Sequence, residues 1–275
     1  MKYKLLLLCD KEYTLFLETM KILIQLLVQN NEKWISHLHS MITALGTDIE
    51  FTTWIYENDS TDNTVKELNK NRNFWNLHIK SYGNKFNHMF RTQRIAHHRN
   101  QFKKFLSTKY DKFQEFDYVI VMDSEIFFNK TTLEKMIETM TTTPDVHMVC
   151  PHGLVMQSLP CHFHYDTWAT LTTDNQRCGQ FTNILECTHQ GAKHDRHCHC
   201  VGGEPPLVKA ASPRLAEFNS FFGGFALLRP RAYAESWWGA DDDSQCDTWK
   251  FCEGVRKHGK VVMDREAKVI WTEWF

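Results

Sequence analysis

The sequence lacks an excess of charge of either sign. Lys and Arg together number 32 and Asp and Glu number 33, so the formal net charge at pH 7 is -1. No bulk field therefore draws the chain towards nucleic acid or an anionic membrane. Any anion that the protein binds must be held by local groups.

We also expect neither a membrane span nor a secretory signal. Its most apolar helical window, Leu15 to Val28, is interrupted by Glu18, Lys21 and Gln25. That window falls short of the roughly 20 apolar residues that a span needs. The opening MKYKLLLLCDKEY has neither the length nor the cleavage site of a signal peptide. Because the nine cysteines are odd in number and scattered, we expect a reducing compartment and a cytoplasmic protein.

What is present suits one large α/β domain spanning residues 1–275. Hydrophobic residues make up 42% of the chain, which is enough to fill a sizeable core. Apolar runs predict strands at 4–9, 49–56, 77–80, 118–122, 147–150 and 261–270. Helical spacing predicts helices at 13–45 (with a break near 29–32), 65–69, 90–105, 131–139 and 248–258. The alternation predicts a mostly parallel central sheet flanked by helices, with long loops at about 152–217.

Acidic residues follow several of the predicted strands. The stretch FDYVIVMDSEIFF runs from a buried strand directly into Asp123 and Glu125. Two unpaired buried anions would be costly, so these carboxylates should face a cavity or a cation. An acid-X-acid pair at a strand end suits Mg or Mn together with a diphosphate. The alternative is a turn with two solvated acids. Asp10, Glu57 and Asp59 also lie at predicted strand ends.

Two further segments have a functional and a structural interpretation. In ENDSTDNT (57–64), a carboxylate could accept a hydrogen bond from a nucleobase or ribose, or the segment could be a capping turn led by Ser60 or Thr61. In RTQRIAHHRNQ (91–101), three arginines, Arg91, Arg94 and Arg99, could point at phosphates or form a solvated basic face.

The cluster CTHQGAKHDRHCHC (187–200) contains enough Cys and His for a zinc site but lacks paired CXXC spacing. A flexible loop and a disulfide between Cys187 and Cys198 are the alternatives. Gly223 and Gly224 would let backbone approach a bound molecule closely. The tryptophans at 168, 237 and 238 suit either stacking against a ligand or an ordinary core.

Taken in order, these pieces resemble GT-A glycosyltransferases. The strand, ENDSTDNT, the helix with Arg99-Asn100 and then VIVMDSEIFF are similar to the nucleotide-sugar-binding half of that family, over residues 4–130. The family's DXD motif, which carries the metal, corresponds to Asp123-Ser124-Glu125. Glu125 replaces the family's second Asp, which changes the expected metal geometry.

The second half, 131–275, resembles the fungal capsule-associated mannosyltransferase group. The similar segments are CHFHYDTWAT, NSFFGGFALLRPRAY and SQCDTWKFCEGVRKHGKVVMD. Gln245 stands where that group has an acid before the cysteine. The chain, in which we expect no anchor, also resembles glycosyltransferases of large algal viruses, which build capsid glycans in the host cytoplasm. That resemblance implies a xylosyltransferase using UDP-xylose, although no residue selects a pentose over a hexose.

The resemblance implies a metal-dependent transfer from a nucleotide-sugar to a hydroxyl of a glycan or glycoprotein acceptor. A Mn or Mg ion at Asp123 and Glu125 would neutralise the leaving nucleoside diphosphate, and Asp243 or Asp247 would act as the base. The implied donor-binding residues are Asp10, Glu57, Asp59, Arg94, Arg99, Asn100, Ser124, Gly223 and Gly224. The implied acceptor-binding residues are Asp166, Trp168 and Trp237.

Three alternatives remain open at this point. The first is a mannosyltransferase that uses GDP-mannose. The second is a non-catalytic carbohydrate-binding or zinc-stabilised module. The third is a nucleotidyltransferase, although the Gly-rich phosphate loop expected after the first strand is missing. We expect neither a nucleic-acid partner nor a membrane span.

Overall fold

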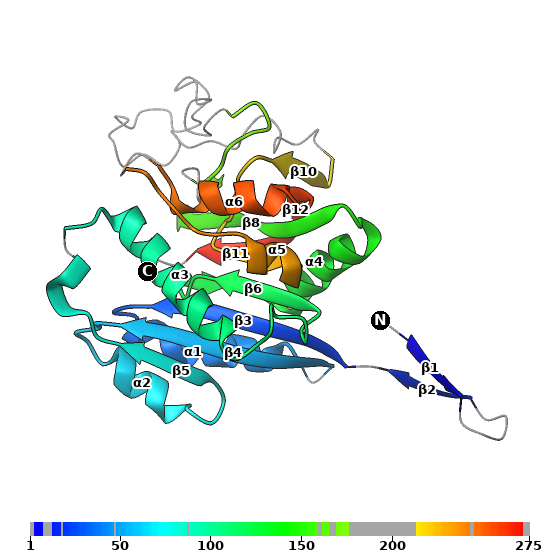
Figure 1. Cartoon of the computed structure of the whole chain (residues 1–275), viewed down its shortest axis with the longest axis horizontal. Coiled ribbons are helices and arrows are strands. Elements are labelled where there is room, and N and C mark those ends of the chain that lie inside the picture. Colours follow the sequence, from blue (N-terminus) through cyan, green and yellow to red (C-terminus); the bar gives the residue numbers. More distant parts are fainter. Residues whose placement is uncertain are drawn as a thin grey trace.

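The computed structural model describes residues 3–7, 13–17, 19–46, 48–86, 88–158, 161–164, 169–175, 213–242 and 245–271. Its main feature is a ten-stranded sheet (Figure 1). Eight strands follow the order β10 (Leu215–Phe218), β12 (Lys260–Trp271), β8 (Val146–Ser158), β11 (Phe225–Leu228), β6 (Tyr118–Met122), β3 (Met20–Val28), β4 (Ile49–Asn58) and β5 (Asn76–Lys80). The short β7 (Ile126–Phe127) pairs with β12, and β9 (Cys161–His164) pairs with β8.

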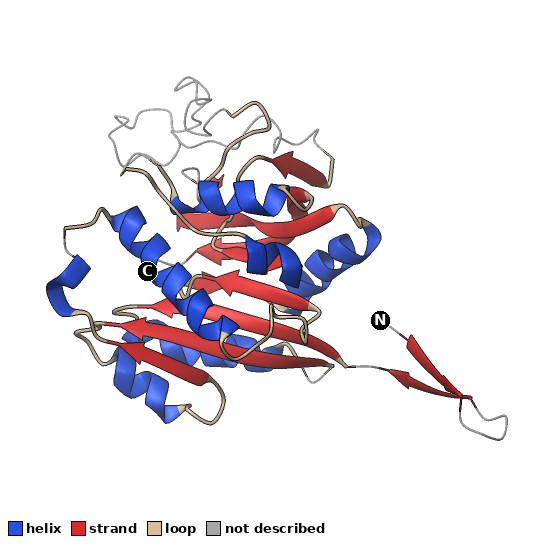
Figure 2. Cartoon of the chain, viewed as in Figure 1, coloured by secondary structure: helices blue, strands red, loops and turns tan. Residues whose placement is uncertain are grey.

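Helices cover both faces of this sheet (Figure 2). One core lies between the sheet and α1 (Glu32–Ala44), α2 (Thr64–Lys70) and α4 (Lys130–Thr142). The other lies between the sheet and α3 (Arg91–Ser107), α5 (Pro230–Glu235) and α6 (Asp247–Arg256). Along β3, Ile22 and Ile24 face the first core and Leu23 faces the second. The central strands are therefore buried on both sides, and the predicted α/β class with a central sheet and flanking helices is confirmed.

The prediction of a helix from residue 13 was wrong. Residues 13–17 form β2 (Tyr13–Leu17), which pairs with β1 (Tyr3–Leu7) in a separate antiparallel hairpin, and residues 20–28 form β3. A strand buried on both faces has a nearly continuous apolar run instead of an alternating one. Lys21 and Gln25, four residues apart, gave that run a helical appearance. The first strand of the central sheet is thus β3, and not the run 4–9.

The other predicted elements of the first half agree with the structure. The strands β4, β5 and β6 were predicted, and they run parallel to β3 or to one another where they pair. The helices α2 and α3 begin within a residue of their expected positions. The short η1 (Gly83–Phe86) precedes α3. None of the described helices is long and apolar enough to cross a membrane.

The second half mixes strand directions. β11 runs antiparallel to β6 and β8, whereas β12 runs parallel to β8. The predicted loop region at 152–217 was too broad, because β8 continues to Ser158 and is followed by β9, and β10 begins at Leu215. Residues 176–212 lie outside the described part. This half places Gly224, Phe222 and the amino end of α6 beside the carboxyl end of β6.

Candidate active site

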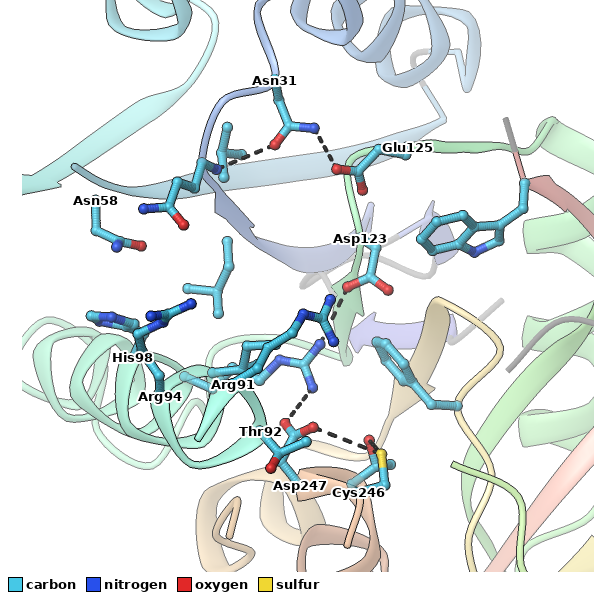
Figure 3. A pocket seen from close by; sticks show the side chains of 18 residues that line it. Asn31, Asn58, Arg91, Thr92, Arg94, His98, Asp123, Glu125, Cys246 and Asp247 are labelled. Carbon is cyan, nitrogen blue, oxygen red and sulfur yellow. Dashed lines mark hydrogen bonds and ion pairs between the residues drawn. The ribbon is translucent and has the colours of Figure 1, made fainter. Parts of the chain in front are cut away.

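A cavity of about 270 Å³ lies at the carboxyl ends of β3, β4 and β6. The amino-terminal half of α3 and the amino end of α6 supply its opposite wall (Figure 3). Parallel strands gather ligands beyond their carboxyl ends, so this is where a site is expected. Its described lining contains three arginines and three carboxylates: Arg91, Arg94, Arg99, Asp123, Glu125 and Asp247.

Asp123 and Glu125 both line the cavity, as the sequence predicted. The residue between them, Ser124, is 2% exposed and is not part of the described lining, so the pair presents its two carboxylates on one side. Glu125 accepts a hydrogen bond from Asn31 Nδ2. The backbone N–H of Asp123 donates to Gly224 O at 2.8 Å, which fixes the start of the segment against β11.

Gly223 and Gly224 allow the chain to pack closely at this point. Both have positive φ, +62° and +76°. A Cβ on Gly224 would lie 2.7 Å from Trp271 Nε1, and one on Gly223 would lie 3.1 Å from Pro151 O. Neither glycine belongs to the described lining of the cavity. Their described role is therefore close backbone packing behind Asp123.

Arg99 joins two of the carboxylates. Its Nη2 lies 3.2 Å from Asp123 Oδ1, and its Nη1 lies 2.7 Å from Asp247 Oδ2. The guanidinium stacks between Trp238 and Phe222, at 4.4 and 5.0 Å from their ring centroids. Burial acts to lower the pKa of Arg99, but Asp247 and Asp123 outweigh it and raise the pKa. Arg99 is thus a permanently charged bridge between the end of β6 and the start of α6.

Arg91 and Arg94 are differently placed. Both line the cavity, yet within the part of the chain that the structure describes neither makes an ion pair. His98, one turn after Arg94, also lines the cavity and is 5% exposed. Burial, with His97 and Arg94 adding to it, lowers the pKa of His98 to about 4. The imidazole is therefore neutral at pH 7, and the two arginines carry the accessible positive charge of this wall.

Two acids of ENDSTDNT, Glu57 and Asp59, accept hydrogen bonds from groups of the protein itself. Glu57 Oε1 accepts from Ser60 N at 2.8 Å. Asp59, at φ +53°, accepts from Ser81 Oγ and from the N–H groups of Tyr82 and Gly83 at 2.9–3.1 Å. Neither acid belongs to the described lining, which takes Asn58 from this turn.

The turn also differs from its predicted capping. Asn63 occupies the N-cap position of α2, without a side-chain capping bond. The backbone N–H of Thr64 is instead accepted by Asp62 Oδ1 at 2.9 Å. The expectation that Ser60 or Thr61 caps this helix was therefore wrong. Both residues contact the turn after β3, where Ser60 Oγ accepts from Asn30 N at 2.9 Å.

Two residues that the sequence predicted to bind ligand, Asn100 and Trp237, contact other parts of the protein. Asn100 exchanges two hydrogen bonds with the backbone of Trp238, at 2.8 and 3.0 Å. Trp237 is 46% exposed and stacks with Lys103, whose Nζ lies 4.3 Å from the ring centroid. Neither Asn100 nor Trp237 belongs to the described lining. Asn100 and Lys103 thus fix the segment that leads from α5 towards α6.

Several predicted site residues lie outside the described residues: Asp10, Asp166, Trp168, Asp243 and the Cys/His cluster at 187–200. Among the residues that are described, no group of three or more His, Cys, Asp or Glu side chains could hold a metal ion.

Sequence reasoning missed Asn31, Asn58, Phe222 and Cys246, all of which line the cavity. Asn31 was missed because residues 13–45 were predicted as helix, so that the end of β3 was interpreted as a break in that helix. Had β3 been recognised, the polar residues after it would have been candidates by the same strand-end rule that found Asp123. Cys246 lies beside Asp247 and Thr248, with its Sγ 3.5 Å from Thr248 Oγ1.

Comparison with known proteins finds similarity at the level of structure. The sequence matches no protein-family model, and no curated protein matches it. The fold is similar to the crystal structure of S. aureus TarS 1-349, with a TM-score of 0.53 and 14% identity over 92% of this chain and 60% of that one. It is also similar to TarS 1-349 in complex with UDP-GlcNAc, with a TM-score of 0.52 and 15% identity over 92% and 59% of the two chains.

At that level of identity the likeness shows the fold alone. The chain spans about 60% of the length of the TarS 1-349 structures. Together with the sheet order, the similarity confirms the α/β fold that the sequence predicted.

Proposed function

We propose that this protein is a glycosyltransferase that transfers a sugar from a nucleotide-sugar, with UDP-sugars favoured, to a hydroxyl of a glycan acceptor. The observation that carries the proposal is the single cavity in which Asp123 and Glu125 face the arginines of α3. The fold gives further support, because TarS, which has a similar fold, has been crystallised with UDP-GlcNAc. The cavity occupies the strand-end position where α/β sheets bind nucleotides.

Asp123 and Glu125 fit a divalent cation in their chemistry. Both offer hard carboxylate oxygens to the same cavity, and Mg is commonly held by one or two carboxylates together with substrate phosphates. The formal charges of the described lining cancel, since three arginines oppose three carboxylates. One Mg or Mn ion would give the cavity two positive charges, which match the two phosphates of a nucleotide-sugar. When bound, the ion would neutralise the leaving diphosphate.

The arginines of α3 divide into two roles in this proposal. Arg99 already holds Asp123 and Asp247, so we assign it to the alignment of these carboxylates. Arg91 and Arg94 face the cavity, and we assign to them the contact with the diphosphate. Their positive charge would stabilise the negative charge that develops as the bond between the sugar and the phosphate oxygen breaks.

Asp247 is the candidate base within the described residues. It is 5% exposed, lines the cavity and is fixed through Oδ2 by Arg99. In a displacement with inversion, the acceptor hydroxyl attacks the anomeric carbon and its proton passes to Asp247, while the bonding electrons leave with the diphosphate. Asp243 remains a second candidate from the sequence.

The donor sugar is the finer part of the proposal. UDP-xylose is the donor to test first, on the resemblance to algal-virus enzymes, and GDP-mannose is the alternative. We also propose that the acceptor belongs to a protein-linked glycan.

The test is calorimetric titration with UDP, GDP, UDP-xylose, UDP-glucose, UDP-GlcNAc and GDP-mannose, each in Mn²⁺ and in EDTA. We expect one nucleotide class to bind, more tightly with Mn²⁺. Asp123→Ala should lose the Mn²⁺-dependent part, with transfer lower by about 10²–10³. Arg231→Ala, which alters an exposed pair with Glu235, is the control and should behave as wild type. Absence of binding by every nucleotide would contradict the proposal and favour a glycan-binding module.

A further inference from the structure

Glu125 depends on a residue from a different part of the chain. Its Oε1 accepts a hydrogen bond from Asn31 Nδ2 (Figure 3). Asn31 follows β3 and lines the same cavity with 6% exposure. The two residues are far apart in sequence, so the contact exists because β3 and β6 are neighbours in the sheet.

Asn31 is itself held at three atoms. Its side-chain Oδ1 accepts from Gln29 N at 3.2 Å, and its backbone N–H donates to Thr64 Oγ1 at 2.7 Å. Its Nδ2 is the group that donates to Glu125. Thr64 is completely buried at the start of α2. With the backbone and the amide oxygen both held, the amide nitrogen has a defined direction, which is towards the Glu125 carboxylate.

Several hydrogen bonds join the turn that contains Asn31 to ENDSTDNT. Thr61 N donates to Asn30 Oδ1 at 2.8 Å. Asn63 N donates to Glu32 Oε2 at 2.6 Å, and Glu32 N donates to Asp62 Oδ2 at 3.2 Å. Besides Asn58, which lines the cavity directly, ENDSTDNT therefore contributes to the cavity by holding the 29–32 turn through these hydrogen bonds.

We propose that Asn31 is a positioning residue that directs the Glu125 carboxylate into the cavity, and that Thr64 holds Asn31 for this purpose. The proposal rests on the proposed function, because the purpose of a directed Glu125 is to bind the divalent cation that accompanies the nucleotide diphosphate. Side chains that orient metal ligands through hydrogen bonds typically contribute about tenfold to hundredfold to metal affinity. The orientation of Glu125 then depends on the Asn31 amide, which lies 94 residues away in the sequence.

Asn31→Ala removes the donor to Glu125, and Asn69→Ala is the matched control. Asn69 lies on the exposed side of α2, where its Nδ2 donates to Val65 O at 2.7 Å, and it has no described contact with Asn31 or Glu125. UDP affinity is measured by calorimetry in Mn²⁺ and in EDTA, and the Mn²⁺ concentration is varied at fixed UDP. We expect Asn31→Ala to need about tenfold to hundredfold more Mn²⁺, with its affinity in EDTA unchanged. Asn69→Ala should stay within about threefold of wild type in both.

Thr64→Val and Thr64→Ser form a second pair, which serves if Asn31→Ala does not fold. Valine removes the hydroxyl that accepts from Asn31 N, whereas serine retains it. We expect Thr64→Val to need a higher Mn²⁺ concentration than wild type at fixed UDP, and Thr64→Ser to need the same concentration as wild type. A direct structural readout is the crystal structure of Asn31→Ala, in which Glu125 should adopt a different side-chain rotamer.

The outcomes separate this inference from the proposed function. If wild type binds UDP with Mn²⁺ and Asn31→Ala does the same at the same Mn²⁺ concentration, the positioning role is wrong and the proposed function stands. Equal losses in Asn31→Ala and Asn69→Ala would also overturn it, because the loss would then not depend on the contact with Glu125. UDP binding that is identical in Mn²⁺ and EDTA overturns the inference but leaves a nucleotide site. If wild type binds no nucleotide, both fail.

Discussion

The acids at the end of β4 and the acids of the cavity look alike in sequence but differ in their partners. Glu57, near the end of β4, and Asp59, which follows β4, accept hydrogen bonds from backbone N–H groups. Asp123, which follows β6, and Asp247 instead share the guanidinium of Arg99. The carboxylates of the first group hold the protein backbone, whereas those of the second group line the cavity. The described contacts of these acids thus differ in kind, since one group meets backbone N–H groups and the other meets an arginine that also lines the cavity.

The largest expected effect comes from removing the bridge that distinguishes the cavity acids. Arg99→Met would leave Asp247, with a side chain 7% exposed, beside Asp123 without a counter-charge. Breaking a buried pair in this way typically costs about 3–5 kcal/mol. We expect the free energy of unfolding in urea to fall by that amount. Arg94→Met is the control, with a change within about 0.5 kcal/mol. Equal losses in both variants would show that Arg99 is no more important to the fold than its neighbour.

The second prediction separates the base from the other acids of its run. Asp247→Asn should lower kcat by about 10²–10⁴, because the amide cannot take a proton, while UDP affinity in Mn²⁺ changes little. Asp241→Asn alters an exposed acid that pairs with Lys250 and should leave kcat unchanged. Steady-state transfer assays with titration of UDP measure both. A kcat loss in Asp241→Asn alone would assign the base to the exposed part of the run.

The smallest effect is expected in the turn after β4. Burial acts to raise the pKa of Asp59, but hydrogen bonds from Tyr82, Gly83 and Ser81 outweigh it and lower the pKa. A lowered carboxylate pKa stabilises the fold above the unfolded value, near pH 4, and this stabilisation is lost as pH falls through the folded value.

Asp59→Asn should therefore cost about 1 kcal/mol in urea unfolding at pH 7 and less below about pH 4. UDP binding should stay within about threefold of wild type, because Asp59 acts on the backbone of residues 81–83. Loss of UDP binding with unchanged stability would erase the distinction between the two groups of acids, because Asp59 would then be a ligand-binding residue.

The sequence predicted most elements of the fold but misplaced its first central strand. β6 was recognised because its apolar run is short and ends in two acids. β3 was not recognised, since burial on both faces removed the alternation that marks a strand, and its two polar residues matched helical spacing. The antiparallel β11 could not be inferred either, because strand direction in a mixed sheet depends on partners that are distant in sequence.

For the site, sequence reasoning found Asp123, Glu125, Arg94 and Asp247, all of which line the cavity. It also selected Asn100 and Asp59, whose side chains bond to backbone groups of the protein itself. Residue type and position could not separate these two outcomes, because each of these side chains is chemically able to bind a ligand. What differs is which groups the fold brings within hydrogen-bonding distance.

The α/β alternation and the acid pair after a buried strand could be predicted from the amino-acid sequence, because hydrophobic periodicity and local charge are properties of short segments. The bridge from Arg99 to Asp123 and Asp247 and the contact between Asn31 and Glu125 could be seen only in the folded chain. These contacts join residues separated by 24 to 148 positions. Their existence depends on which strands become neighbours in the sheet, and that is settled by burial across the whole chain.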